Sequence, residues 1–165
     1  MLMIQKLMPS TVCSGKCSEN KGLKMAEFYI TLPTQNIAEQ IAALLNLQNK
    51  LYKVHNILSI MNSPATYFVE VEGEKIVGCS ALIKEHPTLS KSYHTSVLPS
   101  HQKKGIASKL LKTAMDNCET RYIYGTIRQD NLPSLGLVKK LGWQQIRRDW
   151  NKDHWVVTMA KKVKA

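Results

Sequence analysis

The sequence predicts an α/β protein in which one mixed sheet, of the α+β kind, carries helices on both faces. Two parts of the chain predict this architecture. Residues 66–83 have the pattern of a strand, a tight turn and a return strand, which is an antiparallel hairpin. Residues 91–127 have the pattern of a strand, an amphipathic helix and a further strand, and such a helical crossover joins parallel strands. A sheet that contains both kinds of connection is mixed.

Three elements are expected before the hairpin. Residues 27–32 are rich in β-branched and aromatic side chains and stop at Pro33, which predicts a strand. Apolar residues recur at helical spacing up to Gln48, which predicts a helix over 37–48. A second helix is expected over 51–61, with an apolar face made of Val54, Ile57, Leu58 and Met61.

The hairpin and the crossover supply the central elements. The turn Glu72-Gly73-Glu74 joins strands 66–71 and 75–83, because glycine adopts a positive φ without strain. A fourth strand is expected over 91–98, a helix over 104–118 and a fifth strand over 121–127.

A helix and two strands complete the chain. Asn131 caps a helix that ends at Leu141-Gly142, where glycine is favoured. Two closing strands cover 143–150 and 154–159, with Trp150 expected in the core. The predicted order is therefore β-α-α-β-β-β-α-β-α-β-β.

Length and composition favour one ordinary globular domain. The chain has 165 residues and 44% hydrophobic residues, and it contains no apolar run near the ~20 residues that cross a bilayer. We expect residues 1–25 to be a disordered extension and 26–165 to form a single domain. The four cysteines suggest no disulfide framework, which favours a reducing, cytoplasmic setting.

The cysteines also bear on metal binding. Cys13 and Cys17 have the spacing of half a zinc site, but no second Cys/His pair has a matching spacing, so no metal is expected. Cys79 and Cys118 lie in apolar patterns and are expected in the core.

The charge balance points to anionic ligands. The formal net charge is +11 and the sequence pI is near 9.6, which suits a nucleotide cofactor, nucleic acid or an acidic protein face. A basic rim at Arg147-Arg148, together with the tail 161–164, could guide tRNA or DNA. No recognition helix or series of stacking aromatics predicts sequence-specific reading.

The run 97–111 is the most informative motif. A strand end is followed by a short basic turn, Gly105 and an amphipathic helix. Unpaired backbone N–H groups and the positive end of a helix dipole then meet at one point, which favours a phosphate or pyrophosphate. The spacing Gln102-x-x-Gly105-x-Ala107 is neither the dinucleotide-binding Gly-x-Gly-x-x-Gly nor a P-loop.

A second motif lies downstream, in Asn131-x-x-Ser134-x-x-Leu137-Val138-x-x-Leu141-Gly142-Trp143. With Val97-x-Pro99 and the glycine turn, it resembles the acyl-CoA-binding signature of the GNAT family of N-acetyltransferases. The resemblance covers 66–150 closely and 27–160 more loosely, and it implies the GNAT acyl-CoA N-acyltransferase fold.

The resemblance implies acetyl-CoA as co-substrate and also allows a homodimer. In the family, the strand edge at Val97 pairs with the pantetheine amides, and the turn binds the pyrophosphate. The lysines, including Lys109, would add neutralising charge. The implied cofactor-binding residues are Val97, Gln102, Lys103, Lys104, Gly105, Ile106, Ala107, Ser108, Asn131 and Ser134.

The catalytic residues are less well defined. The family usually has a tyrosine that protonates the leaving thiolate, but Val138 stands at that position. Tyr124 on the next strand could replace this acid, or could be a packed aromatic. Strand alternation places Tyr93 and His94 on opposite faces, so only one can point at the cofactor. His94 is either the base or a satisfied histidine beneath a helix; Glu85 and His86 could act through water.

The expected function is acetyl-CoA-dependent transfer of an acetyl group to a primary amine, on a small molecule or a protein. One alternative is a non-catalytic GNAT-fold module that binds acyl-CoA or regulates, which the valine at position 138 motivates. The other is a transferase or binder that acts on nucleic acid or aminoacyl-tRNA, which the basic surplus motivates.

Overall fold

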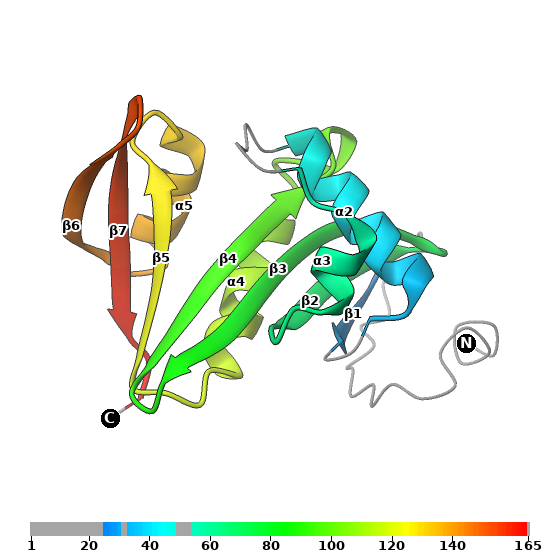
Figure 1. The fold of residues 1–165 in the computed structure, drawn as a ribbon, viewed down its shortest axis with the longest axis horizontal. Coiled ribbons are helices and arrows are strands. Elements are labelled where there is room, and N and C mark those ends of the chain that lie inside the picture. The colour runs from blue at the N-terminus through cyan, green and yellow to red at the C-terminus, as the bar shows by residue number, and fades with distance from the viewer. Residues whose placement is uncertain (1–24, 31–32, 49–53, 165) are drawn as a thin grey trace.

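The computed structural model describes residues 25–30, 33–48 and 54–164. Their elements follow the predicted order, with one added 3-10 turn (Figure 1). The elements are β1 (Met25–Ile30), α2 (Gln35–Gln48), α3 (Ile57–Met61), β2 (Thr66–Glu72), β3 (Lys75–His86), β4 (Leu89–Val97), η1 (Pro99–His101), α4 (Ile106–Asp116), β5 (Tyr122–Arg128), α5 (Leu132–Lys140), β6 (Gln144–Asn151) and β7 (His154–Lys162).

The strands of the described ranges form one sheet in the order β1-β2-β3-β4-β5-β7-β6. Only β4 and β5 pair in parallel, across the α4 crossover, and every other neighbouring pair is antiparallel. The last strand, β7, therefore lies between β5 and β6. The predicted mixed α/β sheet is confirmed.

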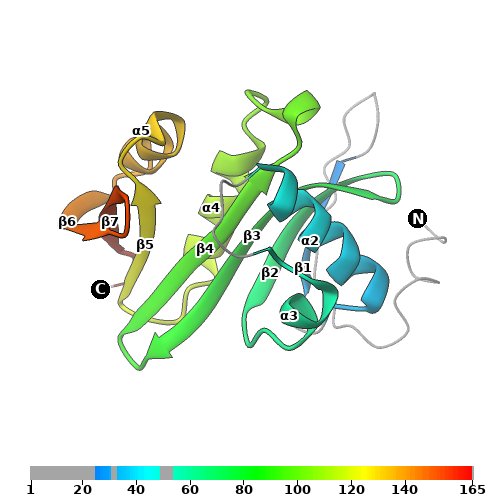
Figure 2. The same ribbon diagram turned by 45° about the horizontal axis from the view of Figure 1, so that its top comes forward.

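Helices cover both faces of the larger block of strands. Helices α2 and α3 lie on one face of β1–β4, and α4 lies on the other (Figure 2). A Cβ built on Gly78 of β3 would come within 2.7 Å of Cγ2 of Ile106, so α4 packs directly onto the backbone there. Cys79 and Cys118 are fully buried, as predicted.

Strands β4 and β5 stay together only briefly. Their pairing is limited to Leu89–Lys91 against Tyr122–Tyr124. Beyond these residues the two strands diverge, as Figure 1 shows. The sheet therefore opens into a V between its two blocks.

The second predicted helix is shorter than expected. Within the described residues 54–61, α3 begins only at Ile57, because the Asn56 side chain accepts a bond from the Ser59 backbone and Ser59 bonds back to Asn56. Val54 and Leu58, expected on a buried face, are 75% and 66% exposed.

The predicted alternation along β4 is wrong. Cys79 and Ala81 of β3 pair with Ser96 and Tyr93, so β4 has an extra residue in a β-bulge, where His94 has a φ of 55°. The bulge turns Tyr93 and His94 to the same side of the sheet, with their ring centroids 4.2 Å apart.

Trp150 is not a core residue. It lies on the edge strand β6 and is 57% exposed, because no helix or strand of the described chain covers that end of the sheet's C-terminal hairpin. Residues 1–24 lie outside the described ranges, and with them the Cys13–Cys17 half-site and most of the expected N-terminal extension; Met25 already belongs to β1.

The described residues contain neither a metal-ligand cluster nor a membrane-spanning helix. Among them, no group of three or more His, Cys, Asp or Glu side chains could hold a metal ion. None of the helices in these same ranges has the length and apolar character required to span a bilayer.

Candidate active site

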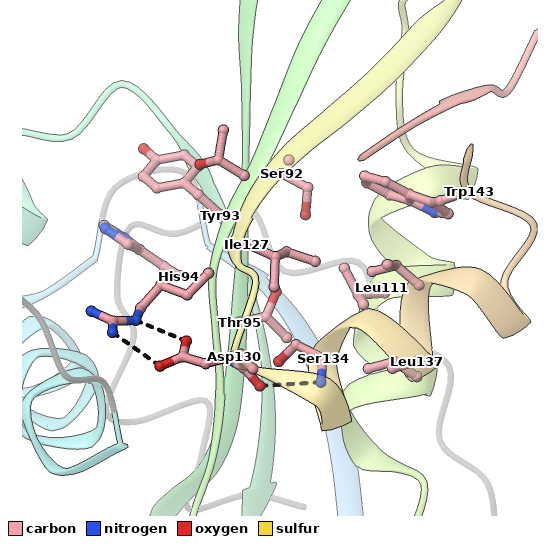
Figure 3. Close-up of a pocket in the computed structure, with 15 residues that line it drawn as sticks. Ser92, Tyr93, His94, Thr95, Leu111, Ile127, Asp130, Ser134, Leu137 and Trp143 are labelled. Carbon is pink, nitrogen blue, oxygen red and sulfur yellow. Dashed lines mark hydrogen bonds and ion pairs between the residues drawn. The ribbon is translucent and has the colours of Figure 1, made fainter. Parts of the chain in front are cut away.

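A cavity of about 530 Å³ occupies the V between β4 and β5 (Figure 3). Helices α4 and α5 complete its walls. The lining residues are Ser92, Tyr93, His94, Thr95, Leu111, Gly125, Thr126, Ile127, Arg128, Asp130, Asn131, Ser134, Leu137, Val138 and Trp143. Tyr93 and His94 point to one side of the strands, and Ser92, Leu111 and Trp143 lie on the other.

The predicted phosphate turn stands at the start of α4. Lys103 and Gly105 have φ angles of 61° and 81°, and α4 begins at Ile106. Nothing lies within 4 Å of a Cβ built on Gly105, so the glycine meets a backbone requirement and leaves open space above the helix start. Gln102, Lys103 and Lys104 are exposed. The Gln102 N–H already bonds to the Pro99 carbonyl at 3.3 Å, so the part of the turn that could take an anion begins at Lys103.

A histidine–carboxylate hydrogen bond and an ion pair hold this turn to the end of β2. His101 Nε2 lies 3.0 Å from Glu72 Oε2. Lys109 Nζ lies 3.0 and 2.9 Å from the two oxygens of Glu70, which is only 1% exposed. Lys109 was expected to neutralise phosphate, but the structure pairs its ammonium group with this buried carboxylate.

Of the other predicted cofactor residues, Asn131 and Ser134 line the cavity, whereas Val97 and the first residues of α4 do not. Asn131 caps α5, since its side chain accepts a bond from the Ser134 N–H at 3.2 Å, and both residues line the cavity. Val97 is buried opposite Gly78, and its carbonyl oxygen accepts a bond of 3.3 Å from the Gln102 side chain. Ile106 is buried, whereas Ala107 and Ser108 are partly exposed in the first turn of α4.

A polar cluster covers the α2/α3 side of the β4 bulge. The Tyr93 hydroxyl lies 3.2 Å from Ser63 Oγ, and the Tyr67 hydroxyl lies 3.1 Å from His94 Nδ1. The His55 ring meets the His94 ring edge-on at 4.5 Å. No sequence motif marks Ser63, Tyr67 or His55, because they lie 27 to 39 residues from their β4 partners and only the fold brings them there.

Burial controls the charge of this cluster. Removal from water, with smaller contributions from the nearby His55 and Lys91, lowers the pKa of His94 to about 3. Burial also raises the pKa of Tyr67 well above its ordinary value of 10.0. At neutral pH, Tyr67 therefore keeps its proton and His94 is uncharged, and the hydrogen bond joins two neutral groups, either of which can be the donor.

The mouth of the cavity carries one ion pair among its lining residues. Arg128 Nε and Nη2 each lie 3.0 Å from an oxygen of Asp130. In Figure 3 its partner Asp130 lies on the same side of the strands as His94. Arg128 and Asp130 belong to neither sequence motif, since they precede Asn131 in an ordinary loop pattern.

Comparison with known families decides the identity. The family model described as "Acetyltransferase (GNAT) family" matches residues 34–143. The chain belongs to this acetyltransferase family.

Solved structures show the same fold at low identity. The Salmonella typhimurium protein yncA, solved with its cofactor acetyl-CoA, gives a TM-score of 0.70 at 14% identity, covering 85% of this chain and 94% of that chain. The ribosomal-protein-S18-alanine N-acetyltransferase from Escherichia coli gives 0.72 at 14%, covering 84% and 95%.

A protein that is similar in sequence is also named as an acetyltransferase. An N-alpha-acetyltransferase from Sulfurisphaera tokodaii is 32% identical over 98 residues, a match that covers 50% of this chain and 59% of the relative. The chain thus matches little more than half the length of that protein. The expectation of a GNAT N-acetyltransferase is confirmed at the level of the family.

Two remaining candidates have clear positions in this acetyltransferase. Val138 is buried in the wall of the cavity. Tyr124 lies outside the residues that line the cavity, and its hydroxyl donates a 2.5 Å bond to Glu85. Partial burial, and then this carboxylate, raise the pKa of Tyr124 to about 12.

Proposed function

We propose that this acetyltransferase transfers an acetyl group from acetyl-CoA to a primary amine by direct attack on the thioester. One observation carries the proposal: β4 and β5 separate after three residue pairs and enclose a 530 Å³ cavity, whose wall includes Leu111 of α4, the helix that follows the glycine turn. The structure of yncA with acetyl-CoA, in the same fold, supports it.

The residues of the chain fit the co-substrate. The diphosphate lies on the N–H groups of 103–107, since the Gln102 N–H already bonds to the Pro99 carbonyl. Gly105 leaves the approach open there, and Lys103 and Lys104 add positive charge. The pantetheine arm follows the free edge of β4, near Val97, and passes the side chains of Asn131 and Ser134. Acetyl-CoA supplies an activated acetyl group: its C–S bond breaks as the amine nitrogen bonds to the carbonyl carbon.

The amine approaches from the α2/α3 side, where Tyr93 and His94 form the wall at the bulge. His94 is neutral there and acts as a hydrogen-bond donor, because a pKa of about 3 makes it a poor base near pH 7. Asp130 is already paired with Arg128, so this ion pair brings little net charge to the incoming ammonium group. The ammonium proton leaves to water before attack.

The leaving thiolate has no tyrosine beside it. Val138 cannot donate a proton, and Tyr124 is held by Glu85 outside the cavity. A CoA thiolate is a good leaving group, so water in the cleft is sufficient to protonate it. We therefore infer a slower reaction than a tyrosine at position 138 would allow.

The acceptor class that we propose is the α-amine of a polypeptide. Two similar proteins support it by name, the N-alpha-acetyltransferase of Sulfurisphaera tokodaii and the S18-alanine N-acetyltransferase of Escherichia coli. A panel of peptides with free N-termini, matched to N-blocked peptides that carry one lysine, tests it with acetyl-CoA consumption as the readout. Turnover on the lysine peptides alone would contradict the α-amine assignment.

A pair of glycine variants tests the site of the diphosphate. Gly105→Asp adds negative charge and backbone strain at the turn, and calorimetry should show that acetyl-CoA binding is lost. Gly73→Asp is the matched control, since Gly73 also has positive φ (+62°) and open space, but lies in the β2–β3 turn. Equal affinities of the two variants would refute the assignment. Binding without turnover on any amine would instead refute catalysis.

A further inference from the structure

An exposed aromatic patch lies on the β6–β7 hairpin, made of Trp150, Trp155 and Arg148. Trp150 and Trp155 are cross-strand partners whose ring centroids lie 5.2 Å apart at 73°. The Arg148 guanidinium carbon lies 4.0 Å from the centre of the Trp155 ring. The two indoles remain 57% and 40% exposed. A cross-strand tryptophan pair stabilises a hairpin, but this pair leaves much of its surface in water.

The aromatic patch is separate from the catalytic cleft. Side chains alternate along β7, so Trp155 shares a face with Val157 and Met159, which are buried. Met159 pairs with Gly125, whose missing side chain would point toward Trp143 and the α4/α5 side. The patch therefore faces away from α2 and α3, and none of its residues lines the cavity.

The charges around the patch favour a polyanion. The acids of the hairpin, Asp149 and Asp153, are already bonded to Arg147 and His154, at 2.7 and 2.8 Å. Arg148 instead presents its planar cation on an indole face, a geometry that suits both stacking and phosphate contact. The whole chain carries a net charge of +11. A second copy of this chain would bring equal charge against the patch, which disfavours self-association.

We propose that the aromatic patch binds single-stranded nucleic acid, with a base stacked on the exposed face of Trp150 and a phosphate held by Arg148. Flat indole surfaces accept any base, because every base has a π-face, and a basic surface follows the backbone. The site therefore gives affinity without sequence preference. An acidic peptide would satisfy the charges but would leave the indole faces without a stacking partner.

Tryptophan fluorescence tests the proposal directly. Trp143 is only 4% exposed, so a solvent-accessible ligand changes mainly the emission of Trp150 and Trp155. Oligothymidine should quench this emission. An abasic oligonucleotide of the same length keeps the phosphates without the bases, and it should bind about tenfold more weakly. Equal affinity of the two ligands, equal binding of poly-glutamate, or no binding of oligothymidine at low salt would overturn the proposal.

Substitutions separate stacking from charge. Trp150→Leu should raise the dissociation constant for oligothymidine about tenfold. Arg148→Lys keeps the positive charge but loses the planar guanidinium group. The control is Arg121→Lys, the same exchange at a guanidinium group that lies over the Tyr122 ring. Arg148→Lys should weaken binding of oligothymidine more than this control. Unchanged affinity in Trp150→Leu would overturn the proposal, as would a concentration-dependent dimer that this substitution abolishes.

Discussion

The hydroxyl group of Tyr67 lies 3.1 Å from Nδ1 of His94 and connects the second strand of the sheet to the bulge of the fourth. Burial raises the pKa of the phenol and lowers the pKa of the imidazole, so the bond joins two groups that are both neutral near pH 7. The charge state of the acceptor wall is therefore a property of the fold.

The low pKa of His94 predicts a pH-dependent stability. The folded state holds this ring neutral down to about pH 3, whereas the unfolded chain protonates it near its ordinary value of 6.5. The stabilisation is thus complete above pH 6.5 and is lost as pH falls toward 3. Between pH 6.5 and 5, we expect its contribution to the free energy of unfolding to fall by about 2 kcal/mol.

Denaturant unfolding at several pH values measures this slope. In His94→Gln the loss on acidification should be smaller by that amount, whatever the variant's absolute stability. His86→Gln is the matched control, since His86 is exposed at the end of β3. A His94→Gln protein with the wild-type slope would show that another group titrates.

Val138 predicts a gain of activity. A tyrosine at this position would place a phenol in the cleft wall, where a proton donor is missing. If protonation of the thiolate limits turnover, Val138→Tyr should raise kcat at least about tenfold. Val138→Phe has nearly the same shape without the hydroxyl and controls for repacking. Equal rates for the Tyr and Phe variants would mean that protonation does not limit turnover.

The Glu70–Lys109 pair predicts unequal costs for its two halves. Lys109→Met leaves the Glu70 carboxylate, which is 1% exposed, without this ammonium partner, and should destabilise the protein by about 2 kcal/mol. This cost is lower than for a fully buried ion pair, because the Lys109 side chain is 43% exposed. Glu70→Gln removes the charge itself and should cost about 1 kcal/mol. Chemical denaturation of both variants and of the double variant measures the coupling, and equal single costs would contradict this account.

The local sequence pattern was sufficient to predict much of the fold. The helix stop at Leu141-Gly142 and the cap at Asn131 depend on neighbours in sequence, and the structure places both as expected. The Asn56–Ser59 capping box is also local, and an Asn-x-x-Ser pattern could have corrected the start of α3.

The acceptor side of the site could not be predicted in this way. The partners of Tyr93 and His94 are 30 and 27 residues away, and they reach the strand only through the register of β2, β3 and β4. The bulge at His94 reverses the face of Tyr93, and nothing in the local sequence marks it. The role of Lys109 could not be predicted for the same reason, because its partner Glu70 lies 39 residues away in the sequence.

The position of β7 has a consequence for synthesis of the protein. The ribosome makes this strand after every other strand of the described sheet, yet it supplies the neighbour that joins β6 to β5. The emerging chain can therefore assemble β1–β4 early, whereas β6 can pair with its neighbour only after β7 has been made. The far wall of the cleft is therefore completed only after β7 has been made, so the co-substrate can bind only once translation has passed this strand.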